Sequence, residues 1–191
     1  MPLPAPHLVQ PPSPAETNAC LLAFDSATEM LAVALQKGER VWAHDGPGGA
    51  VASARLIPEI RALLDTAGLA LSDLDAIAFG AGPGAFTGLR TACSVAQGLA
   101  FGASLPVLAI DSLMVVAEAA REEATATADG GPIEVHVAMD ARMDQIYAAA
   151  YRWVDGHWQS LMPPALHTLA SLHASWRDRP PRLVAGSAAG A

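Results

Sequence analysis

Residues 76–90, AIAFGAGPGAFTGLR, lead from an apolar run through a glycine-rich loop into a helical pattern. The loop itself, residues 80–88, contains four glycines. Between a strand and a helix, such a loop directs backbone N–H groups towards one point, where an anion can bind. The segment therefore predicts a buried strand, a tight loop and a helix, and it makes a nucleotide-phosphate site the first hypothesis to examine.

Two familiar kinds of nucleotide site use such a loop. A P-loop ends in Gly-Lys-Ser/Thr, and it is excluded because Lys37 is the only lysine of the chain. A dinucleotide-binding loop fits the G-x-G-x-x-A spacing over residues 80–85, with Asp111 ending the next apolar run. Against it, residues 86–88 prolong the loop past the point where the helix should begin. A nucleotide-dependent enzyme, a small oxidoreductase or kinase, is therefore the alternative function for the 80–88 loop.

The pattern of apolar residues predicts the order βββ-α-β-α-β-α for the first part of the chain. Because strands joined by crossover helices run parallel, the later strands should join the first three in a mixed sheet. The expected strands are residues 20–25, 30–36, 40–45, 74–80 and 105–111, and the expected helices are residues 53–67, 89–102 and 112–123.

Alternating apolar residues at 133–139 and 146–153 begin a second set of hairpins. A short helix near 169–176 and a strand at 182–186 follow, and no closing helix is expected after them. We therefore predict two small lobes, the second ending short, behind a disordered Pro-rich leader. Their expected bounds are 1–19 for the leader, 20–124 for the first lobe and 125–191 for the second.

The amino-acid composition excludes several classes of protein. A hydrophobic content of 52% excludes a mainly disordered chain, and a net charge of −8 argues against autonomous binding of nucleic acid. Cys20 and Cys93 form no CxxC pair, which disfavours a zinc site and fits a reducing cytosol. Residues 91–110 carry no charge, but Gly98 and Pro106 interrupt them, so a buried helix and strand explain them better than a membrane span.

A third arrangement joins the loop to the turn after the first strand. Asp25 ends that strand, and a small polar turn leads into a second antiparallel strand, which resembles the phosphate-binding turn of the actin/Hsp70/sugar-kinase fold. Here we expect the arrangement to be structural, with Asp25 capping the turn and Thr28 bonding backbone. The residues of this candidate phosphate turn are Asp25, Ser26, Thr28, Gly82, Gly84, Thr87 and Gly88.

Three blocks of the chain together resemble the bacterial TsaB (YeaZ) family: FDSATEMLAVAL, AFGAGPGAFTGLRTACSVAQGLAFGASLPVLAIDSL and VAMDARMDQIYAAAY. The resemblance covers residues 20–190. It implies an α/β fold of the actin/Hsp70-like (ASKHA, RNase H-like) class, with a mixed sheet and flanking helices. Members of this family are subunits of the machinery that makes threonylcarbamoyladenosine in tRNA. They are pseudo-enzyme relatives of TsaD, which transfers the threonylcarbamoyl group to N6 of the adenine next to the anticodon.

The resemblance also implies partners. The chain would pair with a TsaD-like subunit, or with a second copy of itself, and support assembly with a TsaE-like ATPase in the cytoplasm. No two of the six histidines are four residues apart, as the HxxxH-type metal site of TsaD requires. We therefore expect no metal, no cofactor and no catalysis. Direct contact with tRNA is not expected from a chain of charge −8.

The helix expected over residues 89–102 carries no charge after Arg90. A helix that is apolar nearly all round must be buried on two sides, one against the sheet and one against another helix or a partner. In the resembling family, this helix and that over 53–67 meet the partner; a fully internal helix is the alternative. The expected interface residues are Leu56, Ile60, Leu63, Ala92, Cys93, Ala96, Leu99 and Ala100.

Overall fold

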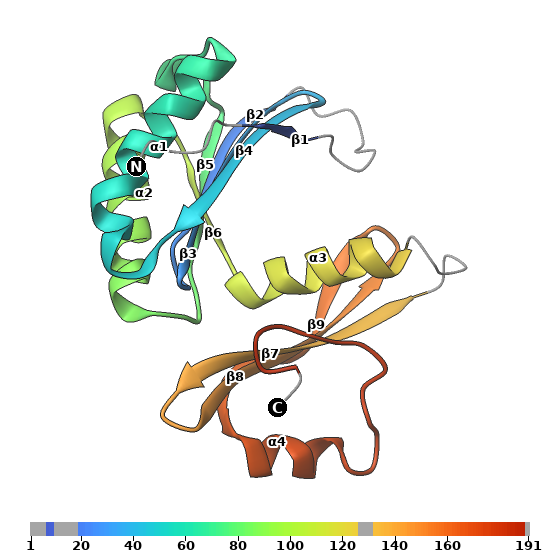
Figure 1. Ribbon diagram of the computed structural model, residues 1–191. Coiled ribbons are helices and arrows are strands. Elements are labelled where there is room, and N and C mark those ends of the chain that lie inside the picture. The colour runs from blue at the N-terminus through green and yellow to red at the C-terminus, as the bar shows by residue number, and fades with distance from the viewer. Residues whose placement is uncertain (1–6, 10–18, 126–131, 190–191) are drawn as a thin grey trace. The chain divides into compact units, whose positions relative to one another are not determined.

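The computed structural model describes residues 7–9, 19–125 and 132–189 (Figure 1). The chain divides into two compact units, residues 1–110 and 111–191. Most of the leader expected to be disordered lies outside the described residues. Within that leader, His7–Val9 forms strand β1 and pairs antiparallel with β4.

The first unit is a six-stranded mixed sheet in the order β1-β4-β3-β2-β5-β6. Strand β3 pairs antiparallel with both β2 and β4, whereas β5 pairs parallel with β2 and β6 pairs parallel with β5. The mixed sheet and its three opening antiparallel strands are therefore confirmed. The bounds are β2 Cys20–Asp25, β3 Met30–Lys37, β4 Arg40–Pro47, β5 Ala76–Gly80 and β6 Val107–Ile110.

Helices α1 (Ala52–Ala67) and α2 (Phe86–Ala103) lie on the same face of this sheet (Figure 1). Alternate residues of β2 and β3, such as Leu22 and Leu35, point towards the helices and are fully buried. Gly68 ends α1 in the left-handed conformation (φ 67°), which glycine adopts without a steric penalty. The short 3-10 helices η1 (Gly49–Val51) and η2 (Leu71–Asp73) flank α1.

Helix α2 begins earlier than the sequence predicts. We expected residues 86–88 to extend the loop, but the helix starts at Phe86. The reason is packing: Gly88 is buried in the first turn of α2, so a residue that resembles a loop glycine is a contact glycine of the helix. The objection to a dinucleotide-binding loop that rested on its length is therefore wrong.

The second unit has a four-stranded sheet in the order β10-β7-β8-β9. Helix α3 covers one face with Leu113 and Ala117, and α4 covers the other with Leu172. Strand β10 runs parallel to β7, and the other pairs are antiparallel. The bounds are α3 Ser112–Thr125, β7 Ile133–Arg142, β8 Gln145–Val154, β9 His157–Thr168, α4 Leu169–Trp176 and β10 Val184–Ala185.

The boundary between the units differs from the expected one at residue 124. Helix α3 belongs with the second sheet, because Leu113 and Ala117 pack against Val135 and Tyr151 of that sheet. With α3 set aside, the second unit repeats the βββαβ order of the first, and the strand order β9-β8-β7-β10 corresponds to β4-β3-β2-β5. Among the described helices, none is long and apolar enough to cross a membrane.

Candidate functional site

The turn after β2 and the loop after β5 are bonded directly to each other. Ser26 is fully buried, and its hydroxyl donates to the carbonyl oxygen of Gly88 at 2.9 Å. The backbone N–H of Ala85 donates to the carbonyl oxygen of Ala27 at 2.7 Å. Within the turn, the N–H of Ala27 donates to Asp25 Oδ1 at 2.6 Å. These bonds join the two segments of the candidate phosphate turn into one closed unit.

Three glycines allow the two segments to come this close. A Cβ atom on Gly88 would lie 1.8 Å from the carbonyl oxygen of Ser26, and one on Gly84 would lie 2.5 Å from that of Ala27. A Cβ atom on Gly80 would lie 1.8 Å from Asp25 Oδ2. The contacts of Gly84 and Gly88 are with backbone oxygens, which cannot move aside as a side chain can, so glycine is required at these two positions for packing, independently of any ligand.

The other residues of the candidate phosphate turn have local roles. Gly82 has a positive φ of 96°, which favours glycine. Thr28 Oγ1 accepts from the N–H of Met30 at 3.1 Å, and the carbonyl oxygen of Thr87 accepts from the hydroxyl of Thr91 at 2.9 Å. Two of the backbone N–H groups that could face a phosphate, those of Ala27 and Ala85, already donate to the chain. The described residues also contain no cluster of three or more His, Cys, Asp or Glu side chains that could hold a metal ion.

Asp111, the acid that a dinucleotide site would use for the ribose, is bonded within the second unit. Its Oδ1 accepts from the N–H of Leu113 at the start of α3 at 2.9 Å. Its Oδ2 accepts from the hydroxyl of Tyr151 at 2.6 Å. Tyr151 is fully buried, and burial, followed by the bond to the Asp111 carboxylate, raises the pKa of Tyr151 above its ordinary value. Both carboxylate oxygens therefore serve the fold, which weakens the dinucleotide interpretation on grounds other than loop length.

The expected interface residues on α1 and α2 mostly face the sheet. Six of them are at most 4% exposed and belong to the hydrophobic core, while the remaining two, Cys93 and Leu99, are half-buried. The core six hold the two helices to the strands, so they are not available to a partner in this structure. Those six residues are Leu56, Ile60, Leu63, Ala92, Ala96 and Ala100.

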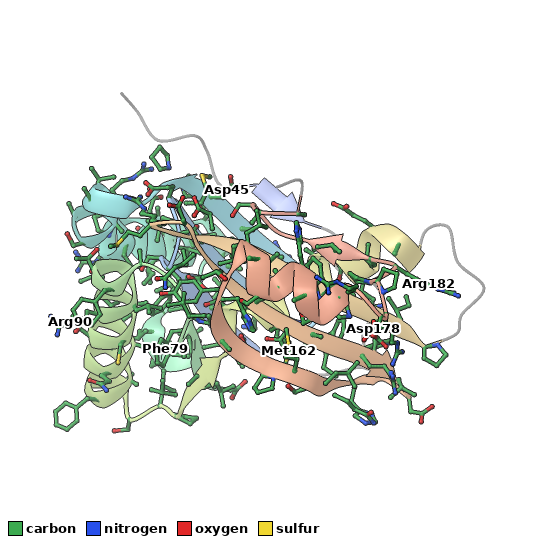
Figure 2. All side chains as sticks on the ribbon, turned by 90° about the horizontal axis from the view of Figure 1, so that it is seen from below. Asp45, Phe79, Arg90, Met162, Asp178 and Arg182 are labelled. Atoms are coloured by element: carbon green, nitrogen blue, oxygen red, sulfur yellow. The ribbon has the colours of Figure 1, made fainter. Side chains whose placement is uncertain are left out.

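The side of α2 opposite the alanines carries a different set of residues, which we call the outer helix face. Phe101 is 91% exposed, and Phe86 is 65% exposed with the guanidinium of Arg90 3.8 Å from its ring centre. Figure 2 shows Arg90 on the side of α2 away from the sheet. Nothing lies within 4 Å of a Cβ atom built on Gly98 or Gly102. The outer helix face consists of the exposed residues Phe86, Arg90, Ser94, Gln97, Gly98, Phe101 and Gly102 of α2.

A signal for this face was present in the sequence. Gly98 and Gly102 are one helical turn apart and so lie on one side of α2, while alanines 92, 96 and 100 form a second row at the same spacing. The alanine row and the glycine row lie on opposite sides of the helix. Only the structure shows that the alanines face inward.

The two sheets and their topology define the class of this protein. A sheet of three antiparallel strands continued by parallel strands, with its βββαβ order repeated in the second unit, is a mixed α/β fold of the ASKHA-like class. YeaZ from Pseudomonas aeruginosa has a similar structure, with a TM-score of 0.71 and 42% identity over 78% of this chain and 67% of that one.

Sequence comparisons then identify the family. The family model for TsaD, tRNA N6-adenosine threonylcarbamoyltransferase, matches residues 50–182. The tRNA threonylcarbamoyladenosine biosynthesis protein TsaB of Escherichia coli is 37% identical over 164 residues, which cover 82% of this chain and 68% of that protein. TsaB of Haemophilus influenzae is 43% identical over 131 residues, which cover 68% of this chain and 52% of that protein. The chain belongs to the TsaB (YeaZ) family, whose members are related to TsaD.

Proposed function

We propose that this chain is a non-catalytic partner subunit in the synthesis of threonylcarbamoyladenosine in tRNA. Its relatives in Escherichia coli and Haemophilus influenzae are biosynthesis proteins for this modified nucleoside. The chain spans 68% and 52% of the length of those two proteins. In this proposal, it binds a TsaD-like subunit that performs the transfer to adenine N6, and a TsaE-like ATPase joins the larger complex in the cytoplasm.

The observation that carries the proposal is the outer helix face. An exposed aromatic ring such as Phe101, beside the open surface over Gly98 and Gly102, has the form of a contact for another helix. Small residues let two helix axes approach closely, and aromatic anchors supply much of the binding energy at protein interfaces. The partner would therefore present a helix that lies along α2, with Phe101, near the C-terminal end of α2, as the main anchor. A second copy of this chain would use the same face when no TsaD-like subunit is present.

The candidate phosphate turn supports a non-catalytic role. Its two segments are closed against each other by the Ser26–Gly88 and Ala85–Ala27 bonds, which leaves the turn with a structural task. Contact with tRNA is assigned to the partner, because a net charge of −8 repels the phosphate backbone.

The proposal is tested by purifying the chain with the TsaD-like subunit of the same organism and measuring the complex by size-exclusion chromatography. We expect a stable complex with the unaltered chain. The Phe101→Glu variant replaces the most exposed aromatic side chain of the face by a charge and should elute alone as a folded protein. Unchanged elution of the variant with the subunit would rule out this face as the interface.

A further inference from the structure

The hairpin between β7 and β8 has an unusual tip. Arg142, Met143 and Asp144 have φ values of 63°, 53° and 58°, so three consecutive residues other than glycine adopt the left-handed conformation. This conformation is unfavourable for residues with a Cβ atom, although Asp tolerates it better than Arg or Met. Strain of this kind persists only where the surrounding structure holds it, and it is concentrated at functional sites.

A neighbouring hairpin of the same sheet uses residues that adopt a positive φ with little strain. Between β8 and β9, the two turn residues with positive φ are Asp155 and Gly156, a pair that suits such turns. A tip that served only to reverse the chain could use the same pair. The use of Arg-Met-Asp at 142–144 therefore points to a task for the side chains.

The base of the tip is held in place by bonds from two directions. The N–H of Arg142 donates to Asp140 Oδ1 at 2.7 Å, and the N–H of Asp140 donates to the hydroxyl of Ser187 at 3.0 Å. The β7–β8 pairing also shifts by one residue between Asp140 and Arg142, a bulge that redirects the strand end. At the end of this supported hairpin, the side chain of Met143 is 90% exposed.

We propose that Met143 is a contact residue for the TsaD-like subunit and that its thioether fills an apolar socket on that protein; the inference rests on the proposed function. An unbranched, polarisable side chain adapts well to such a socket. Its preordered backbone lowers the entropy cost of binding. The tip carries two carboxylates and one guanidinium, from Asp140, Asp144 and Arg142, and this net negative charge fits a protein surface better than the phosphates of an RNA.

The test replaces the tip by a favourable turn without the thioether, in the double variant Met143→Asn/Asp144→Gly. Because Asn-Gly suits two positive φ values, this variant should fold with an unchanged or higher thermal midpoint. We expect its affinity for the TsaD-like subunit, measured by calorimetry, to fall at least tenfold. Met143→Leu keeps an apolar side chain of similar volume and should bind within about twofold of the unaltered chain.

Two results would overturn the inference. One is that the double variant binds the subunit as tightly as the unaltered chain. The other is that the thermal midpoint of the double variant is lower than that of the unaltered chain, because the tip would then be unstrained. If the unaltered chain itself does not bind the subunit, the proposed function fails, and this inference fails with it. A third outcome separates the two proposals: the unaltered chain and the double variant both bind tightly, and only Phe101→Glu loses binding. This outcome leaves the proposed function intact and rejects the tip contact alone.

Discussion

Gly88 of α2 touches the carbonyl oxygen of Ser26 so closely that a Cβ atom on this glycine would lie 1.8 Å from it. Because that oxygen is part of the backbone, it cannot turn away as a side chain could. Gly88→Ala should therefore destabilise the protein by about 1–3 kcal/mol or more, as other overpacked cores are. Urea denaturation measures the effect.

Gly98→Ala is the matched control for this glycine, since it lies in the same helix with nothing within 4 Å of the added Cβ atom. It should stabilise the helix by about 0.5–1 kcal/mol through the better helix propensity of alanine. Equal effects of the two substitutions would show that the contact between Gly88 and Ser26 is not what holds the loop pair together.

The closed loop pair predicts that the isolated chain does not bind nucleotides. The N–H groups of Ala27 and Ala85 already donate to the chain, so a phosphate would have to break these bonds to use them. Titration calorimetry with ATP or ADP, with and without Mg²⁺, should show no binding. A micromolar dissociation constant would contradict the pseudo-enzyme account and favour the nucleotide-dependent alternative.

Ala96→Glu separates the core side of α2 from its outer side. Ala96 is fully buried against the sheet, so a carboxylate there has no water and no partner. An uncompensated buried charge costs about 3–5 kcal/mol. We expect loss of the cooperative unfolding transition in circular dichroism, whereas Gln97→Glu, at an exposed neighbouring position, should keep it. A folded Ala96→Glu protein would show that this side of the helix is accessible to solvent.

Tyr151 should make the stability of the second unit sensitive to alkaline pH. Because burial and the bond to Asp111 raise the pKa of Tyr151, the unfolded chain loses this proton at lower pH than the folded one. The contribution of Tyr151 to the free energy of unfolding is complete below pH of about 10, the ordinary pKa of tyrosine, and is lost as the pH rises above it. The free energy of unfolding should fall there.

Two tyrosine variants isolate this effect. Tyr151→Phe should lower stability at neutral pH by about 2 kcal/mol, because the Asp111 carboxylate loses a donor, and should reduce the alkaline fall. Tyr147→Phe changes the other tyrosine of the chain and should leave most of that fall in place. Similar alkaline profiles for both variants would contradict the role assigned to Tyr151.

Most of the first unit could be predicted from the sequence because its elements have strong local signals. The short apolar runs at residues 20–25 and 30–36 predicted antiparallel strands, and the Leu56–Ile60–Leu63 stripe with Gly68 predicted α1 and its end. The start of α2 was missed, because Thr87-Gly88 has the composition of a loop and only the contact with Ser26 makes it the first turn of a helix.

The orientation of α2 could not be predicted for a physical reason. A helix that is apolar nearly all round has no polar side to mark solvent, so Ala96 was assigned to the partner interface although it belongs to the core. The structure puts the small alanine row against the sheet, where the backbones come close, and leaves the larger Phe101 exposed. The assignment of α3 also depended on contacts distant in sequence, between Leu113 and Val135.

The central claim is that this chain acts by binding a TsaD-like subunit through the outer helix face. Its most direct test is the mass of the mixture by sedimentation velocity, with the unaltered chain and with Phe101→Glu at equal concentrations. We predict a complex of this chain with the subunit for the unaltered protein, and two separate folded species for the variant. A complex of the same mass with both proteins, or none with either, would contradict the account.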